Sequence, residues 1–141
     1  MTSVYLDASA LVPFFVEESH SERAEAFLRS SSAALVVSDF AAAEFASAIA
    51  RRRRMGDLTL AGARNIFDVF DRWAAERAQR VETTSRDVAS AERFLRRLDM
   101  TLRTADALNI ALAMRLGTTI ITFDRRMAEN AHALHADAVL L

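Results

Sequence analysis

The sequence predicts a three-layer α/β/α domain built on a five-stranded parallel sheet. Short apolar runs alternate with longer amphipathic segments along all 141 residues, with no repeat and no linker-like stretch. Strands that are separated by helical crossovers pair in parallel with right-handed connections, and helices then cover both faces of the sheet. A chain of this length can build one core but is too short for two ordinary domains. We therefore expect residues 1–141 to form a single domain.

Five short runs, each bounded by polar residues, are interpreted as the strands. One or two helical segments separate each run from the next, which gives the order β-α-α-β-α-α-β-α-α-β-α-β. The five runs are Val4–Leu6, Leu35–Val37, Val81–Thr84, Thr119–Phe123 and Val139–Leu141.

The segments between these runs begin at residues that commonly cap or start helices. In one of them Phe67, Phe70 and Trp73 recur at helical spacing, so we expect their side chains in the core or in an interface. Gly56 and Gly117 stand where two helices should end. The expected helix starts are Ser19 with Glu22 as a capping box, Ser38 or Asp39, Asp57 or Thr59, Ser85 and Thr104.

The composition excludes several classes of protein. The chain has no Cys, so it has neither disulfides nor thiolate chemistry. All 18 basic residues are Arg, which excludes mechanisms that need a catalytic or phosphate-binding Lys. The formal net charge of −1 gives no overall attraction to nucleic acid, so any such binding has to be local. No apolar run is long enough to cross a membrane, and the N-terminal run is too short for a secretory signal, so we expect a cytoplasmic protein.

Two acidic residues closely follow strands. Asp7 comes after the first run and Asp124 after the fourth, so both belong at the carboxyl edge of the sheet, where such folds bind ligands. Taken alone, each is better explained as an Asx turn or a helix N-cap. Position therefore leaves a structural role and a chemical role open for both.

Two further acids lie within helices that are otherwise apolar. Glu44 is the one charge between Asp39 and Arg51, too far into its helix to be a cap, and a buried unpaired carboxylate is costly there. Asp106 shares a helix face with Asn109, three residues later. For Glu44, a route to solvent or an Arg pair is as plausible as a functional role, and for Asp106 the alternative is an interaction with the helix dipole.

Together the four acids predict a metal site. The fold would bring Asp7, Glu44, Asp106 and Asp124 to the same edge of the sheet, where like charges repel unless a cation compensates them. We expect Mg²⁺ or Mn²⁺, because hard divalent ions prefer carboxylate oxygens as ligands.

Other polar residues lie near these acids in the sequence. Ser9 and Thr122 are each two residues from an acid and would orient it as hydrogen-bond donors, although ordinary strand-edge and turn chemistry explains them equally well. Arg51 to Arg54 form a block at a helix end. A solvated helix end is the simpler interpretation of this block, and a phosphate-contacting patch that includes Arg51 and Arg52 is the alternative.

Four short segments, taken in order, match the pattern of one family. They are Leu6–Val12, Ala43–Glu44 with Arg51 seven residues on, Leu102–Leu108 and Thr122–Asp124. This combination resembles a PIN domain, and its spacing is most similar to that of the VapC-type ribonuclease toxins. The resemblance runs from about residue 4 to the end of the chain. It departs at Asn109, where many relatives have His, and this departure leaves the acids intact.

The resemblance implies a sheet in the order 3-2-1-4-5, so that the first and fourth strands are neighbours. It implies that the four acids bind metal, with Ser9, Thr122 and Asn109 close to them. The implied reaction is hydrolysis of RNA phosphodiester bonds, in which two divalent ions about 3.5–4 Å apart would activate the attacking water and steady the leaving oxygen. A homodimer and a cognate VapB-type antitoxin that covers the site are also implied.

Two other functions remain open. An aspartyl-phosphate enzyme of the haloacid-dehalogenase type also has an Asp after its first strand, but it needs an acid two residues later and a Lys, whereas this chain has Ser9 and no Lys. The second alternative is a non-catalytic PIN-like binding module, which the presence of all four acids disfavours.

Overall fold

The computed structural model describes residues 2–141, and the elements within them follow the predicted order. The strands are β1 (Ser3–Leu6), β2 (Ala34–Ser38), β3 (Ala78–Val81), β4 (Thr119–Thr122) and β5 (Ala138–Leu140). The helices are α1 (Ala8–Phe15), α2 (Ser21–Ser30), α3 (Asp39–Arg54), α4 (Leu60–Arg77), α5 (Ser85–Leu95), α6 (Thr104–Leu116) and α7 (Arg125–Ala133).

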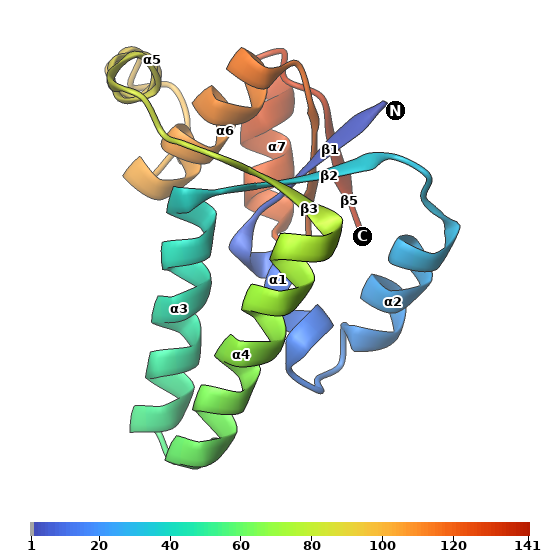
Figure 1. Ribbon diagram of the computed structural model, residues 1–141. Helices are drawn as coiled ribbons and strands as arrows, with labels where there is room; N and C mark the ends of the chain where they lie inside the picture. Colours follow the sequence, from blue (N-terminus) through green and yellow to red (C-terminus); the bar gives the residue numbers. More distant parts are fainter. Residues whose placement is uncertain (1) are drawn as a thin grey trace.

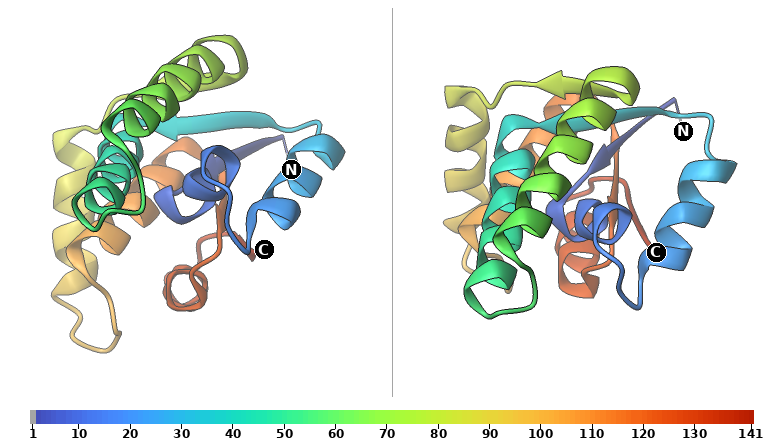
Figure 2. Two further views of the ribbon diagram at one scale, coloured as in Figure 1. Left: turned by 90° about the horizontal axis from the view of Figure 1, so that it is seen from below. Right: turned by 60° about the horizontal axis from the view of Figure 1, so that its bottom comes forward.

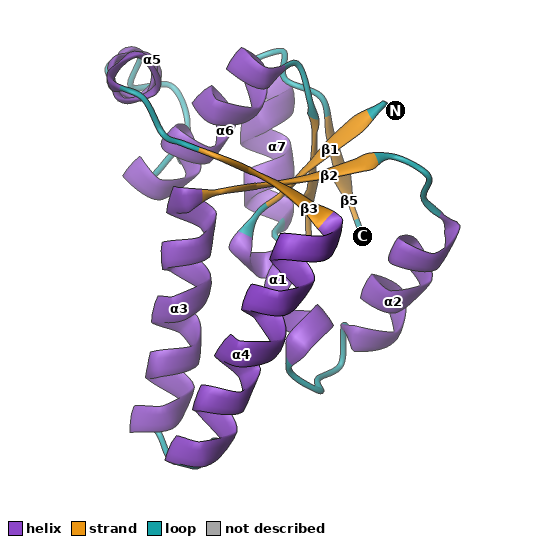
Figure 3. Ribbon diagram, viewed as in Figure 1, coloured by secondary structure: helices purple, strands orange, loops and turns teal. Residues whose placement is uncertain are grey.

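The five strands form one parallel sheet in the order β3-β2-β1-β4-β5, which confirms the expected topology. β1 is the central strand, and its Val4, Tyr5 and Leu6 are completely buried. Successive side chains of a strand point to opposite faces, so the burial of all three requires cover on both faces of the sheet. Figure 3 shows the strands enclosed by helices.

Five of the helices form two packed groups. α3 and α4 run side by side in opposite directions and project beyond the sheet, and α1 packs against α3 (Figures 1 and 2). α5 packs along α6, on another side of the molecule. None of the helices in residues 2–141 is long and apolar enough to span a membrane.

An aromatic cluster fixes the α3–α4 pair to the rest of the core. The ring of Phe45 is fully buried and stacks on Phe70, with 4.5 Å between the ring centroids. Phe15 of α1 meets Phe45 edge-on at 5.6 Å, and Phe67 and Trp73 pack against the same core. The expectation that Phe67, Phe70 and Trp73 of α4 pack in the core is confirmed.

The predicted third strand lies too late in the sequence. The expected run was Val81–Thr84, whereas β3 is Ala78–Val81. Beyond Val81 the chain makes hydrogen bonds outside the sheet. Thr83 donates its backbone N–H to Asp39 Oδ1 at 3.0 Å, and the side chain of Thr84 caps α5. These residues end the strand because their hydrogen bonds leave the ladder. The other strands differ from the prediction by no more than one residue at either end.

The predicted capping box at Ser19 and Glu22 is also wrong. α2 begins at Ser21 after His20, whose side chain makes no capping hydrogen bond. The buried Ser21 hydroxyl instead donates to the Val16 carbonyl and accepts the Glu18 N–H, both at 2.9 Å. These contacts tie the start of the helix to the preceding loop in place of a cap.

The remaining helix starts agree with the sequence. Ser38 caps α3 and Thr59 caps α4, each by accepting a backbone N–H, while α5 and α6 begin at Ser85 and Thr104. Gly117 ends α6 with a φ of +63°, in the left-handed region that glycine adopts without strain.

An ion pair between a buried carboxylate and an exposed guanidinium joins α5 to α6. Arg115 donates to the Asp87 carboxylate through Nε at 2.7 Å and through Nη2 at 3.0 Å, and the Asp87 side chain is only 1% exposed. Burial opposes ionisation of Asp87, but hydrogen bonds from Arg115 and Thr84 outweigh it and hold the pKa of Asp87 below its usual value. Arg115 is therefore the main partner of a buried charge.

We expect Arg115→Met to lower the free energy of unfolding by about 2 kcal/mol, because it leaves the buried Asp87 carboxylate without its guanidinium partner. The exposed pair Arg96–Glu92 provides a matched control, and Arg96→Met should cost less than about 0.5 kcal/mol. Urea unfolding of the two variants at neutral pH measures the difference. Equal losses would show that the burial of Asp87 does not make its ion pair with Arg115 more important than an exposed pair.

Candidate active site

Two acids lie at the carboxyl ends of neighbouring strands. Asp7 follows β1 and Asp124 lies just beyond β4, and β1 pairs directly with β4. Each acid also caps the next helix: Asp7 Oδ1 accepts the Ala10 N–H at 3.0 Å, and Asp124 Oδ1 accepts those of Arg126 and Met127 at 2.9 and 3.3 Å. The capping interpretation is correct for both residues, and it uses one oxygen of each carboxylate.

A triangle of contacts joins Asp7 to two hydroxyls. Ser9 Oγ donates to Asp7 Oδ1 and Thr122 Oγ1 donates to Asp7 Oδ2, both at 2.7 Å, and the two hydroxyl oxygens lie 2.9 Å apart. Three such contacts need three hydrogens, whereas the two hydroxyls supply two. While both hydroxyls donate to the carboxylate, no hydrogen lies between Ser9 Oγ and Thr122 Oγ1. A proton on Asp7 would let one hydroxyl accept from the carboxyl group and donate to the other hydroxyl.

Burial favours the protonated form of Asp7. The residue is only 5% exposed, and this burial raises its pKa to about 6, against the opposing hydrogen bonds from Ser9, Thr122 and Ala10. The negative charge of Asp124 raises the pKa further. The folded protein thus holds a proton on Asp7 more tightly than the unfolded chain does.

Glu44 is held by a contact from another helix. It lies in the second turn of α3 with its side chain half-buried, and Asn109 Nδ2 of α6 donates to its Oε1 at 2.7 Å. Burial raises the pKa of Glu44, the hydrogen bond from Asn109 opposes this, and the charges of Asp7 and Asp106 raise it again. Glu44 forms no ion pair within residues 2–141, so the Arg-pair alternative does not describe it.

Asp106 lies in the first turn of α6, half-buried, where its Oδ2 accepts the Arg103 backbone N–H at 3.4 Å. Burial raises the pKa of Asp106 and the charge of Asp124 adds to the rise, while this hydrogen bond and the positive charges of Arg126 and Arg103 oppose it. Arg126 is itself partly buried, and within the described residues its Nε has no hydrogen-bond partner. Asp106 therefore has a permanently charged guanidinium near it.

The four acids form an electrostatically linked group. The charge of Asp124 acts on Asp7 and on Asp106, and those of Asp7 and Asp106 act on Glu44. Glu44, Asp106 and Asp124 each keep one carboxylate oxygen that has no hydrogen-bond partner among the described residues. Across residues 2–141, however, no three His, Asp or Glu side chains converge closely enough to form a metal site. The fold brings the acids to one end of the sheet without building a complete ion cage.

Two hollows adjoin the acids and meet at Arg52. One, of about 580 Å³, is lined in part by Glu44 and Arg51, and the other, of about 330 Å³, is lined in part by Asp124. Arg52 lines both and also forms an ion pair with Glu18, from the loop before α2. Arg51 and Arg52 therefore line the same hollows as Glu44 and Asp124, although the chain as a whole is nearly neutral.

Sequence reasoning missed two residues near the acids. Tyr5 was grouped with the apolar strand, yet its hydroxyl contacts Asn109 and Ser38. The available signal was that a buried Tyr needs a hydrogen-bond partner for its hydroxyl. Arg126 gives no such signal, because the sequence contains many Arg residues and does not show which of them lies beside Asp106.

Comparison with known proteins identifies the family. A model of the PIN domain matches residues 4–133, a range that contains all four acids. The chain belongs to the PIN domain family. It is also similar to ribonuclease VapC3 of Pyrobaculum aerophilum, with 32% identity over 129 residues that cover 92% of this chain and 95% of the relative.

Solved structures share the PIN fold at lower identity. VapC20 of Mycobacterium tuberculosis, described as a sarcin-ricin loop cleaving toxin, has a TM-score of 0.73 and 17% identity over 90% of this chain and 94% of its own. VapBC2 of Rickettsia felis, bound to a DNA fragment of its promoter, has a TM-score of 0.70 and 12% identity over 98% of each chain. The same fold is thus reached by widely different sequences.

We expect Asp7→Asn to stabilise the metal-free PIN domain at neutral pH. The amide keeps an oxygen for the Ala10 N–H, supplies the hydrogen that the triangle with Ser9 and Thr122 lacks, and removes a buried charge. The folded pKa of Asp7 is raised to about 6 from 3.8, so the folded state binds the proton more tightly. The wild type should therefore lose up to about 3 kcal/mol of stability as the pH rises from about 4 to about 6, and the variant should not.

Denaturant unfolding in EDTA at about pH 4 and about pH 7.5 checks this expectation. Asp68→Asn, which changes an exposed carboxylate on α4, is the control and should leave the pH dependence unaltered. An Asp7→Asn variant that is less stable than the wild type at the higher pH would contradict the interpretation.

Proposed function

We propose that this PIN domain is a divalent-metal-dependent endoribonuclease that hydrolyses RNA phosphodiester bonds, and that it is the toxin of a VapBC-like toxin–antitoxin pair. The observation that carries the proposal is the position of the four acids at one end of the sheet. Asp7 and Asp124 follow the paired strands β1 and β4, and Glu44 is tied through Asn109 to α6, the helix that carries Asp106. The 32% identity to a ribonuclease VapC across nearly the whole chain supports the choice of RNA as substrate.

The available donor atoms fit a hard divalent ion. They are carboxylate oxygens, and the chain has no thiolate that would favour a softer metal. The oxygens of Glu44, Asp106 and Asp124 that lack hydrogen bonds would hold Mg²⁺ or Mn²⁺, and Asp7 would join them on losing its proton. When bound, the ion supplies a water of lowered pKa and neutralises phosphate oxygens.

The protein's own residues position the acids and the RNA. The helix caps hold Asp7 and Asp124 before any ligand arrives, and the hydroxyls of Ser9 and Thr122 fix the orientation of Asp7. Arg51 and Arg52 stand along the adjoining hollows, where guanidinium groups would contact the phosphates of an RNA strand. The two Arg residues would supply the local positive charge that attracts RNA phosphates, since the net charge of the chain is close to zero.

The same proposal includes protein partners. Toxin–antitoxin complexes are among the structures that share this fold, such as the VapBC complex of Salmonella typhimurium, with a TM-score of 0.70. We extend the proposal to a VapB-like antitoxin that covers the acids, to a homodimer, and to the cytoplasm as the place where RNA and antitoxin are both met. Residues 1–141 would act as one PIN-like domain.

Asp106→Asn should reduce RNA cleavage by at least about 100-fold, because it removes one charge and one oxygen ligand. The amide oxygen can still accept the Arg103 N–H at the start of α6. Incubation of a mixed RNA pool with the antitoxin-free protein in Mg²⁺ or Mn²⁺, followed by mapping of the new RNA ends, measures the loss. Asp68→Asn is again the control and should cleave as the wild type does.

Removal of the metal gives the second arm of this test. EDTA should abolish cleavage and added Mn²⁺ should restore it. Cleavage that persists in EDTA or in the Asp106→Asn variant would exclude the metal-dependent mechanism. A wild-type protein that cuts no RNA yet binds an antitoxin would instead be the non-catalytic binding module.

Arg51→Gln should weaken RNA binding several-fold and lower the slope of log affinity against log salt by about 1, because one phosphate contact is lost. Arg54→Gln is the matched control, since Arg54 is exposed at the same helix end but lines neither hollow. Fluorescence anisotropy with a labelled single-stranded RNA, in the Asp106→Asn background to prevent cleavage, measures both. Equal effects of the two variants would remove Arg51 from the RNA surface.

A further inference from the structure

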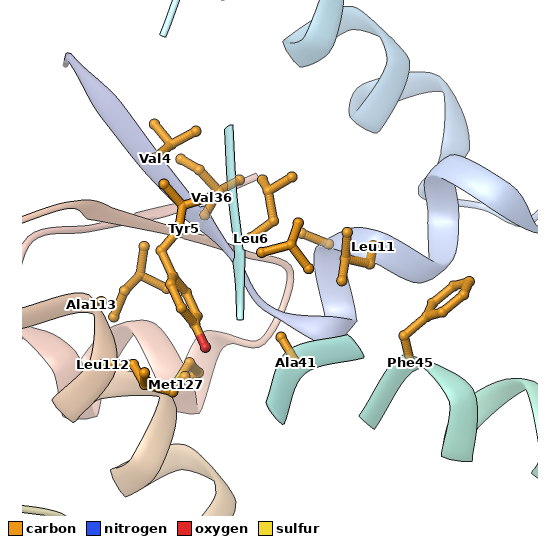
Figure 4. Close-up of a cluster of buried hydrophobic side chains, with 14 of the residues drawn as sticks. Val4, Tyr5, Leu6, Leu11, Val36, Ala41, Phe45, Leu112, Ala113 and Met127 are labelled. Carbon is orange, nitrogen blue, oxygen red and sulfur yellow. The ribbon is translucent and has the colours of Figure 1, made fainter. Parts of the chain in front are cut away.

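A buried tyrosine connects the central strand to the acids. Tyr5 of β1 is fully buried, and Figure 4 shows its hydroxyl directed toward the helices that carry Leu112 and Met127. The hydroxyl donates to Asn109 Oδ1 at 2.5 Å and lies 2.7 Å from Ser38 Oγ. Burial raises the pKa of Tyr5 above its usual value, so the hydroxyl keeps its proton and stays a donor.

The orientation of Asn109 follows from its partners. Its Nδ2 faces two groups that only accept, the Ala105 carbonyl at 3.1 Å and Glu44 Oε1 at 2.7 Å. A turned-over amide would set its oxygen against both acceptors, so Oδ1 has to face Tyr5. Asn109 is only 3% exposed, so water has little access to replace any of these bonds.

The other end of the chain of bonds is fixed in the same way. The Tyr5 hydroxyl has one hydrogen and gives it to Asn109, so the contact with Ser38 requires the serine hydroxyl to donate. Ser38 Oγ in turn accepts the Ala41 N–H at 2.9 Å as the cap of α3. Every hydrogen in the series from Ser38 through Tyr5 and Asn109 therefore points toward Glu44, and bonds aligned in this way strengthen one another.

We propose that Tyr5 is a positioning residue for Glu44, which it holds through Asn109 so that Oε1 is occupied and the other carboxylate oxygen stays available to a divalent ion. The ion's part in this inference rests on the proposed function, whereas the series of hydrogen bonds does not. Without the Tyr5 hydroxyl, Asn109 Oδ1 would be a buried acceptor without a donor, and its amide would lose the contact that holds it against Glu44.

The place of Tyr5 in the fold supports this role. Asp7 follows β1 directly, two residues after Tyr5, and its backbone is still extended, so the two side chains leave the chain on the same face. The central strand therefore carries one acid directly and holds a second across the molecule, on α3, by way of α6. A displacement of β1 would therefore move both Asp7 and the group of contacts that holds Glu44.

Tyr5→Phe removes the hydroxyl and keeps the buried ring. We expect the Mn²⁺ dissociation constant, measured by calorimetry without RNA, to rise by about 10- to 100-fold, as is usual when a group that orients a metal ligand is lost. The kcat for RNA should fall by a similar factor while KM stays within about twofold. Thr118→Val is the matched control, because it deletes another buried hydroxyl, which donates to the Ala113 carbonyl of α6, and it should change neither quantity.

A second readout needs neither metal nor RNA. The side-chain amide hydrogens of Asn109 should exchange with solvent at least about tenfold faster in Tyr5→Phe than in the wild type, as followed by NMR in EDTA. Asn109→Ala, which interrupts the same series without touching the core ring, should weaken Mn²⁺ binding as Tyr5→Phe does. In a Glu44→Gln background, Tyr5→Phe should cause no further loss of Mn²⁺ affinity.

The outcomes separate this inference from the proposed function. If the wild type cuts no RNA but Tyr5→Phe still speeds amide exchange and weakens Mn²⁺ binding, the positioning role stands and the ribonuclease proposal fails. Unchanged amide exchange in Tyr5→Phe would overturn the positioning role, as would an equal loss of Mn²⁺ affinity in Thr118→Val. A wild-type protein that binds no Mn²⁺ would overturn the inference that Tyr5 keeps a Glu44 oxygen available to a divalent ion.

Discussion

The burial of several carboxylates close to one another is the constraint on which the rest of this structure depends. The pKa values of Asp7, Glu44 and Asp106 are all raised, first by burial and then by one another or by Asp124. A fold selected for stability alone has no reason to gather such groups. The parallel sheet makes the gathering possible because it ends β1 and β4 side by side, and helix caps, hydroxyls and an amide then hold each acid in place.

The caps show how structural and chemical roles coexist in one residue. Asp7 and Asp124 each give one oxygen to the start of the following helix, which anchors the carboxylate where the strand ends. Capping and ligand binding are therefore not competing explanations for an acid at this position. A helix N-terminus holds the carboxylate at a fixed angle at little cost, because its N–H groups need an acceptor in any case.

The sequence was most informative where a local rule and the fold agree. Alternating runs gave the order of every described element, and Ser38 and Thr59 marked helix starts because capping chemistry is local. The end of β3 was misplaced because Thr83 and Thr84 turn to long-range and capping partners that a single run does not reveal. The acids were found because charge is conspicuous on an apolar helix, whereas Tyr5 was overlooked because its polar atom is one of many buried groups and its partner lies 104 positions away.

The central position of β1 makes its register against β4 decisive for the acids. Side chains in a strand alternate with a period of two, so a slip of β1 by one residue against β4 would send Tyr5 and Asp7 to the opposite face together. Val4 and Leu6 would then occupy the face on which Tyr5 and Asp7 have their hydrogen-bond partners. A molecule in this register would lose the contacts that hold Asp7 and Glu44 at the same time, so we expect it to be inactive rather than partly active.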